Sequence, residues 1–309
     1  MSPKPIFSAS EHIQRIQNGI LEPLLSELYG SEASAGEQSE RFISLLERHI
    51  QLFGDSPDVR IFSTPGRTEL GGNHTDHNHG RVIAGSIHLD TIAAAAPSGS
   101  NQVILDSVGF EPVRVDLNSL TKVLQEKGTT DALVRGIAMA LNRREIPVTG
   151  FTANTSTRVL KGSGLSSSAA VEILIGSIFK NMAGDKTLSP IDLALCGKFA
   201  ENNYFEKPSG LMDQTACAHG GIIGIDFIDP DNPKVEQLSF DFRKAGYTLC
   251  VVDTGGNHAN LTPEYAAIPQ EMGMVAAFFG KQVLREITIE QVVESAAKLR
   301  VAVGDRPIL

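Results

Sequence analysis

The sequence is poor in cysteine and in basic residues, and each shortage argues against a class of protein. Its three cysteines, among 309 residues, lie far apart and form no CxxC pair. This usage indicates a reduced, cytoplasmic protein whose thiols are small core residues. The 27 basic residues are outnumbered by 36 acidic ones, which leaves a net charge of -9. A nucleic-acid partner is therefore disfavoured, because proteins that bind nucleic acids usually show the opposite balance.

Long apolar runs are also lacking. No stretch of about 18 apolar residues is present to form a membrane span, and the first residues have no apolar signal-peptide core. We therefore expect no membrane partner, and we expect a monomer. The hydrophobic share of 41% is normal for a globular protein, and the length is sufficient for one large domain or two.

Helical and strand-like periods are mixed along the chain, which predicts an α+β or α/β fold. Residues 8–53 are expected to be helical, with apolar side chains at three- and four-residue spacing from Glu40 to Phe53. A mixed or antiparallel sheet with hairpins should follow. The expected strands are 59–63, 82–96, 102–107, 111–117, 151–157, 220–227 and 247–254. The expected later helices are 131–143, capped by Asp131, then 166–182, 190–205 and parts of 263–279 and 288–299.

A loop of small residues, KGSGLSSSAA at 161–170, follows an expected strand and opens a long apolar helix. Glycines permit a close backbone approach, and the first turn of a helix presents unpaired N–H groups with a partial positive charge. Such a place binds phosphate well. A serine-capped turn without a ligand explains the composition equally well. The chain has no Walker A sequence, and this loop lacks the third glycine of a dinucleotide fingerprint.

A polar stretch at 65–80 is rich in histidine and lies between two expected strands. Three of its histidines, with Asp76, could supply metal ligands, although their spacing does not place a pair on one helix face. A hydrogen-bonding platform for a sugar and a solvated loop are the alternatives. A third segment, AENNYFEKPSGLMDQ at 200–214, ends with Asp213, which taken alone would be an ordinary acid in a turn.

The polar stretch, the small-residue loop and the segment at 200–214 resemble motifs of the GHMP kinase superfamily, and most specifically those of galactokinases. They also follow one another along the chain in the order of those motifs. Residues 164–170 fit the ATP-binding core G-L-G/S-S-S-A/S-A/S at every position, although Leu160 replaces a proline that often precedes it. Residues 200–214 are similar to A-E-x-x-F-x-x-x-P-C/S-G-x-M-D-Q, and 258–265 are more weakly similar to H-x-x-x-x-x-E-Y. Residues 66–77 resemble G-R-x-N-L/I/V-I-G-E-H-x-D-Y, with departures at Glu69, Gly71, Asn73 and His77.

The resemblance covers about residues 57–309 and implies the α+β, two-domain GHMP kinase architecture. A ribosomal-protein-S5-like N-terminal domain, with a helical extension and the ATP loop, would span 1–235. A ferredoxin-like C-terminal domain would begin within 236–309 and be incomplete here. Galactokinases continue to a third, glycine-rich motif beyond GDRPIL at 304–309. We therefore expect this chain to be incomplete as a catalyst, with apolar helix faces that lack partners.

The activity that the resemblance implies is transfer of the ATP γ-phosphate to the anomeric hydroxyl of galactose, with Mg²⁺ as cofactor. Asp213 and Arg67 would be catalytic: the aspartate accepts or orients the hydroxyl proton, and the arginine stabilises charge on the phosphoryl group. Ser168 and Glu201 would hold Mg²⁺. The sugar would contact Asn73, His74, Asp76, Gly210 and Tyr265. The ATP phosphates would contact Gly162, Ser163, Gly164, Leu165, Ser166, Ser167, Ser168 and Ala169.

Two other functions compete with this interpretation. One is a GHMP kinase for another sugar or for a non-sugar alcohol. The polar stretch at 65–80 favours a sugar, and a galactokinase-like enzyme over the mevalonate- or homoserine-type enzymes. The other is a sugar sensor without catalysis. Known sensors built on this fold have lost small residues just after the serines of the ATP loop, whereas Ser168-Ala169-Ala170 is intact here.

Asn73 stands where the family has a glutamate that grips the hydroxymethyl end of the sugar. A carboxylate only accepts hydrogen bonds, whereas an amide both donates and accepts. Hydrogen bonds to charged groups are the stronger ones, so the change predicts looser galactose binding, by roughly tenfold in KM. The alternative is that Asn73 makes an equivalent bond.

Overall fold

The computed structural model describes residues 5–30, 32–160, 162–252 and 262–309, apart from the side chains of 32–35, 262, 263, 265 and 266. Within these residues, seven strands form one sheet in the order β4-β3-β5-β2-β6-β7, and β1 also pairs with β2. All pairs are antiparallel except β3 with β5. The expected mixed sheet is therefore confirmed. The strands are β1 (Arg60–Gly71), β2 (Arg81–Pro97), β3 (Gln102–Ser107), β4 (Val113–Asp116), β5 (Phe151–Thr157), β6 (Ile222–Asp226) and β7 (Lys234–Leu238).

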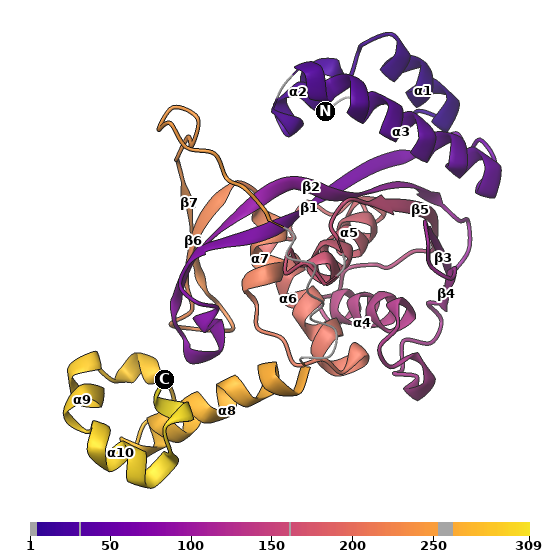
Figure 1. The fold of residues 1–309 in the computed structure, drawn as a ribbon. Helices are drawn as coiled ribbons and strands as arrows, with labels where there is room; N and C mark the ends of the chain where they lie inside the picture. Colours follow the sequence, from indigo (N-terminus) through magenta and orange to yellow (C-terminus); the bar gives the residue numbers. More distant parts are fainter. Residues whose placement is uncertain (1–4, 31, 161, 253–261) are drawn as a thin grey trace.

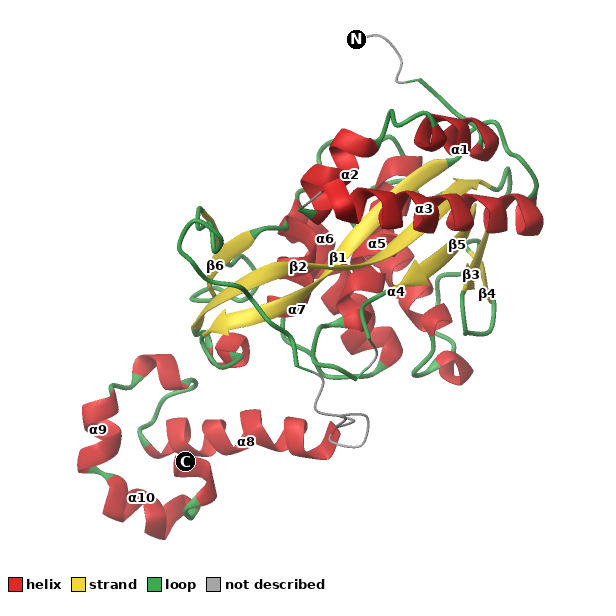
Figure 2. Cartoon of the chain, turned by 45° about the horizontal axis from the view of Figure 1, so that its top comes forward, coloured by secondary structure: helices red, strands yellow, loops and turns green. Residues whose placement is uncertain are grey.

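Helices cover both faces of the sheet (Figures 1 and 2). One layer is formed by α1 (Ala9–Gln17), α2 (Glu22–Tyr29) and α3 (Glu32–Phe53). The other is formed by α4 (Thr130–Asn142), α5 (Ser167–Met182), α6 (Pro190–Ala200) and α7 (Met212–His219). The last helices along the chain are α8 (Thr262–Phe278), α9 (Ile289–Glu294) and α10 (Ala296–Val303).

Strand β2 explains why two layers are needed. Its residues 92–96 are all buried, although successive side chains of a strand point to opposite faces. Ala93 and Ala95 pack in the core beneath α4–α7, whereas Ile92, Ala94 and Ala96 pack in the core beneath α1–α3. An apolar run of this kind, in place of strict alternation, is typical of a strand covered on both faces.

A buried carboxylate attaches the first helical layer to the sheet. Asp90, on β2, is 1% exposed and accepts hydrogen bonds from Tyr29 Oη, Ser63 Oγ and Arg41 Nη1, each at 2.5 Å. These donors belong to α2, β1 and α3, so one ionised group connects three elements. Loss of one partner of such a buried pair is strongly destabilising, because it leaves a charge without compensation.

The expectation that Asp131 caps the helix at 131–143 is wrong. Helix α4 begins at Thr130, and its N-cap is Thr129, whose hydroxyl accepts the N–H of Ala132 at 3.5 Å. A capping residue must be extended and precede the first helical residue. Asp131 is already the second residue of the helix, so it cannot cap; its carboxylate accepts the N–H of Arg114.

The prediction of a strand at 247–254 is also wrong for residues 247–252. Residues 253 and 254 lie outside the described part of the chain. Residues 247–252 form no ladder, and their large apolar side chains are exposed, including Tyr247 (68%) and Val252 (78%). No described strand runs beside this segment, so its backbone groups have no sheet partner. The sequence pattern also missed β7, at the sheet edge, and α7, which has only eight residues.

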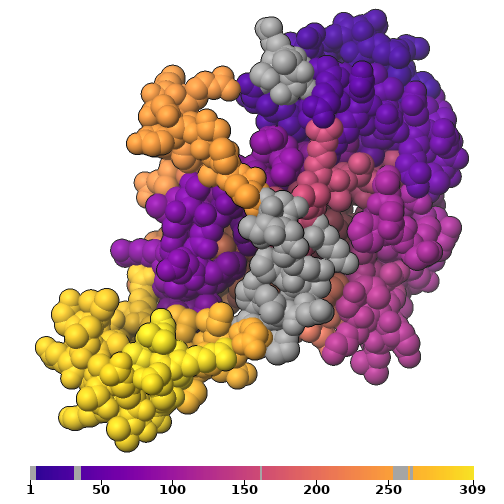
Figure 3. All heavy atoms as spheres, viewed as in Figure 1, coloured from indigo at the N-terminus to yellow at the C-terminus, as the bar shows by residue number. Residues whose placement is uncertain are grey.

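The C-terminal helices form a lobe beside the loop that follows β1 (Figure 3). Met272 of α8 accepts hydrogen bonds at its sulfur from His77 and from Asn78, both at 3.2 Å. Arg285 donates to the carbonyl of His79 at 2.6 Å and pairs with Asp226 at 2.5 Å. Strand β7 spans the domain boundary expected at residue 235, and that division of the chain stays a prediction. Among the described residues, no helix is long and apolar enough to cross a membrane.

Candidate active site

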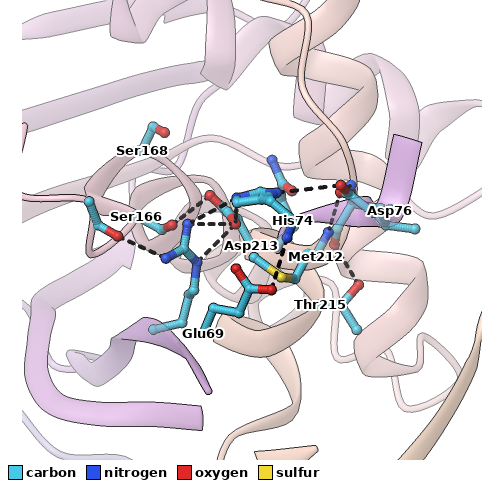
Figure 4. Close-up of polar contacts among 12 residues, drawn as sticks. Glu69, His74, Asp76, Ser166, Ser168, Met212, Asp213 and Thr215 are labelled. Atoms are coloured by element: carbon cyan, nitrogen blue, oxygen red, sulfur yellow. Dashed lines mark hydrogen bonds and ion pairs between the residues drawn. The ribbon is translucent and has the colours of Figure 1, made fainter. Parts of the chain in front are cut away.

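The site lies where the β1–β2 loop, the small-residue loop before α5 and the first turn of α7 meet (Figure 4). Gly66 of β1 packs directly on the small-residue loop: a Cβ at that position would lie 2.8 Å from the carbonyl oxygen of Leu165. The N–H of Arg67 donates to the same carbonyl at 3.2 Å. A glycine is therefore required for the strand and the loop to approach so closely.

The small-residue loop has the form expected of an anion site. Gly162 and Gly164 have φ of +75°, and Ser166, the N-cap of α5, has φ of +59°. The Ser166 side chain does not cap the helix, which leaves N–H groups of the first turn available to a ligand. Its hydroxyl donates instead to Asp213 Oδ2 at 2.6 Å. Ser163 bonds back to the Leu160 carbonyl; Ser167, Ser168 and Ala169 open the helix.

Asp213, the second residue of α7, lies at the centre of the site. Arg67 donates from Nε to Asp213 Oδ1 at 2.8 Å, its Nη2 lies 2.8 Å from the same oxygen, and its Nη1 donates to the carbonyl of Gly164 at 2.8 Å. The arginine side chain is 9% exposed and that of the aspartate 28%. One guanidinium thus joins a single oxygen of Asp213 to the small-residue loop through a charge-assisted hydrogen bond.

His74 adds a second cation beside Asp213. Its Nε2 lies 3.3 Å from Asp213 Oδ1 and its Nδ1 lies 3.4 Å from Asp76 Oδ1. The hydrogen bonds to Asp213 and Asp76 raise the pKa of His74 to about 10. Burial favours the neutral form of Asp213, but His74 and Arg67 outweigh it and hold the pKa of the carboxyl well below its usual range. Asp213 is therefore ionised at neutral pH.

We expect the His74 ring to remain protonated at pH 8, whereas His219, whose pKa is lowered by burial, is neutral there. The pKa of folded His74 exceeds its ordinary value of 6.5. Its contribution to stability is therefore complete below pH 6.5 and is lost as the pH rises toward 10. An NMR titration of the two rings tests this, with His74→Gln to assign the signal. A His74 pKa near 6.5 would contradict the arrangement.

The carboxylate of Asp76 contacts other residues of the protein through both of its oxygens. Its Oδ2 accepts the N–H groups of Leu211 and Met212 at 2.8 and 3.2 Å, and its Oδ1 faces the rings of His74 and His77. Burial opposes ionisation, but these partners lower the pKa of Asp76 well below its usual range. The carboxylate thus caps the start of the helix that carries Asp213. Its predicted role as a sugar ligand stays a prediction.

The other predicted sugar residues are placed differently. Gly210 lies against Asp76, because a Cβ there would come within 1.7 Å of Asp76 Oδ2. Asn73 is exposed at the rim with φ of +53°, a conformation that asparagine tolerates well. Tyr265 belongs to α8, but its side chain lies outside the described residues, as does His258. Glu69 was not predicted as a site residue, and its Oε1 accepts the N–H of His74 at 2.9 Å.

A second acidic group adjoins the small-residue loop. Glu201, buried at the end of α6, accepts Ser168 Oγ at 3.5 Å and Lys207 Nζ at 2.8 Å on one oxygen. Its other oxygen accepts Gln214 Nε2 at 2.9 Å, and the same amide nitrogen donates to Glu172 at 3.0 Å. Burial and the neighbouring Glu201 raise the pKa of Glu172 well above its usual range. Sequence reasoning missed Glu172, Lys207 and Gln214, of which only Gln214 lies on a motif position.

The donor set at Ser168 and Glu201 fits Mg²⁺. A hydroxyl and a carboxylate are hard oxygen ligands, and Mg²⁺ is usually bound by one or two protein groups together with phosphates and water. The histidine-rich loop does not fit a metal. Its His74 and His77 face Asp76 and Met272, and in the described part of the chain no three His, Cys, Asp or Glu side chains are grouped for a metal.

Comparisons with known proteins agree with this geometry. Residues 47–97 match the galactokinase galactose-binding signature, and residues 132–221 match the GHMP kinases N terminal domain. A galactokinase of Streptomyces coelicolor is 30% identical over 259 residues, which cover 83% of this chain and 64% of the relative. One of Streptococcus suis is 33% identical over 201 residues, covering 64% and 50%. The chain thus spans 64% and 50% of the length of these relatives.

The fold is likewise similar to a solved structure. The crystal structure of Lactococcus lactis galactokinase complexed with galactose aligns with a TM-score of 0.71 and 24% identity, over 86% of this chain and 68% of that one. The residues that match the two family descriptions include the polar loop after β1 and the small-residue loop before α5, respectively. The chain therefore carries the galactose-binding signature of the galactokinases and the N-terminal domain of the GHMP kinases, and it is similar to galactokinases over most of its length.

Proposed function

We propose that the protein transfers the γ-phosphate of ATP to the anomeric hydroxyl of galactose, giving galactose 1-phosphate and ADP. The observation that carries the proposal is the position of Asp213. Its ionised carboxylate is held by Arg67, which also holds Gly164 of the phosphate loop, and by His74 of the galactose-binding signature. A sugar hydroxyl at Asp213 would therefore lie between the two loops that such a reaction needs.

Phosphoryl transfer depends on positioning and on charge stabilisation more than on covalent chemistry. Asp213 would orient the anomeric hydroxyl in line with the γ-phosphorus. Because its pKa is low, it would accept the proton only after bond formation has made the hydroxyl acidic. Arg67 would stabilise the charge on the transferring group.

Ser168 and Glu201 would hold Mg²⁺, which when bound supplies charge neutralisation for the phosphates. GHMP kinases use ATP, and the residues 162–169 would contact its phosphates through backbone N–H groups and serine hydroxyls. The loop geometry supports this assignment, since the first turn of α5 is not capped by the Ser166 side chain.

Release of ADP tests the proposal directly. The complete protein is purified and incubated with ATP, Mg²⁺ and one acceptor at a time: galactose, glucose, 6-deoxygalactose or mevalonate. We expect galactose to give the largest kcat/KM. A preference for another acceptor would assign a different GHMP kinase activity. Tight galactose binding without ADP release would favour the sugar sensor and contradict the proposal.

We expect Ser168→Ala and Glu201→Ala each to weaken the use of Mg·ATP by about tenfold, because each removes a ligand or hydrogen bond to a charged group. The galactose KM should change little. Steady-state kinetics with either substrate varied measures both effects. Glu206→Ala is the matched control, since Glu206 is a surface residue that pairs with Lys122 and Lys127. Equal effects on both substrates would argue against a role at the nucleotide.

A further inference from the structure

Lys207 places a positive charge beside the phosphate loop. Its ammonium pairs with Glu201 Oε1 at 2.8 Å, the same oxygen that accepts the hydroxyl of Ser168. The ammonium is thus separated from the loop by a single carboxylate oxygen.

The two partners differ in their freedom to move. The Glu201 side chain is 3% exposed and is also held by Gln214. The Lys207 side chain is 47% exposed, and a lysine has a flexible four-carbon stem that ends in a compact charge. The carboxylate is therefore the fixed partner, and the ammonium can leave it without unpacking the core.

Two carboxylates beside the described part of the loop each have a basic partner. Asp213 is paired with Arg67, and Glu201 with Lys207. Glu172 is 1% exposed and accepts a hydrogen bond from the neutral amide of Gln214, and its raised pKa agrees with a protonated carboxyl. When a divalent cation takes the oxygens of Ser168 and Glu201, the charge of Lys207 is no longer needed there. Phosphate oxygens bound on the loop would then be anions available to it.

We propose that Lys207 is a nucleotide-binding residue, which neutralises Glu201 in the free protein and contacts a phosphate of bound ATP. Lysine is a common phosphate ligand because it presents a mobile point charge. The proposal rests on the proposed function, since it takes the small-residue loop to be the site of the ATP phosphates. Lys207 is not one of the residues that define the motif at 200–214, because any residue may stand at position 207 of that motif.

Binding of Mg·ATP to the full chain, measured by isothermal titration calorimetry, tests the proposal. We expect Lys207→Gln to weaken binding by about tenfold or more, as for loss of a hydrogen bond to a charged group. An amide can still donate to Glu201, so this variant keeps the local contact and removes only the charge. Lys207→Arg should bind within about threefold of wild type, because it keeps the charge.

Lys127→Gln is the matched control. Lys127 pairs with Glu206, the neighbour of Lys207, at 2.5 Å, and its side chain is 61% exposed. Its replacement removes the same charge from the same region. If Lys127→Gln binds Mg·ATP as tightly as wild type, the weaker binding of Lys207→Gln is specific to position 207. A second readout is Mn²⁺ binding without nucleotide, followed by electron paramagnetic resonance. Lys207→Gln should bind Mn²⁺ at least as tightly as wild type, because a competing cation is gone.

The outcomes separate this proposal from the proposed function. If wild type binds Mg·ATP and Lys207→Gln binds it within about twofold, Lys207 has only a structural role and the proposal is wrong. A lower melting temperature with unchanged affinity leads to the same conclusion. If wild type itself binds galactose but no Mg·ATP, the nucleotide site and the kinase function both fail, and this inference fails with them.

Discussion

Asp213→Ala is expected to lower kcat for galactose phosphorylation by at least about 100-fold, the lower end of what a positioned proton acceptor contributes. The physical reason is that the variant removes the one carboxylate that Arg67, His74 and Ser166 all hold in place. Galactose affinity should fall less than kcat, because the polar loop at 65–80 is unchanged. Asp213→Asn keeps the size of the side chain and removes only its charge, so it should lose nearly as much activity.

Two controls accompany this experiment. Asp241→Asn changes an exposed aspartate whose partner is Lys244 and should leave kcat unchanged. Thermal melting of each variant separates a loss of catalysis from a loss of structure, since Arg67 is left without its carboxylate partner. Turnover near the wild-type rate in Asp213→Ala would remove Asp213 from the catalytic assignment.

Gly210→Ala is expected to have a comparable effect by a different route. A Cβ at this position would come within 1.7 Å of Asp76 Oδ2, so the carboxylate must move away from the N–H groups of Leu211 and Met212. Overpacking together with the loss of charge-assisted hydrogen bonds should lower the free energy of unfolding by about 3 kcal/mol. The first turn of α7 would shift, and a displacement of about 1 Å at Asp213 can reduce kcat by about 100-fold.

Denaturant unfolding and steady-state kinetics measure the two effects. Gly273→Ala is the control, because Gly273 lies in helix α8 and a Cβ there meets no atom within 4 Å. In a double-mutant cycle, Gly210→Ala should add little once Asp76 is already alanine, since the two residues are in contact. Full additivity, or a stable and active Gly210→Ala variant, would show that Asp76 does not anchor this turn.

The small-residue loop was predictable because its chemistry is local. Gly162, Gly164 and Ser166 are close in sequence, and their positive φ values follow from the loop that must precede helix α5. Asp213 and Arg67 were predictable only through resemblance, because 146 residues separate them and nothing near Asp213 indicates a cationic partner. The eight residues of α7 are too few for apolar spacing to indicate a helix, so the element that carries Asp213 was not expected.

The sequence alone was sufficient wherever one contiguous segment carries the signal, as in helix α5, the doubly covered strand β2 and the motif at 164–170. Tertiary contacts were needed wherever a group acquires its role from a distant partner. Asp76 caps α7 because it accepts the N–H groups of Leu211 and Met212, which lie 135 and 136 positions further along the chain. The ammonium of Lys207 lies beside the small-residue loop because α6 packs on α5 and brings Glu201, the partner of Lys207, to Ser168. Hydrogen bonds and ion pairs form between neighbours in space, and local periodicity contains no information about which distant residues those neighbours will be.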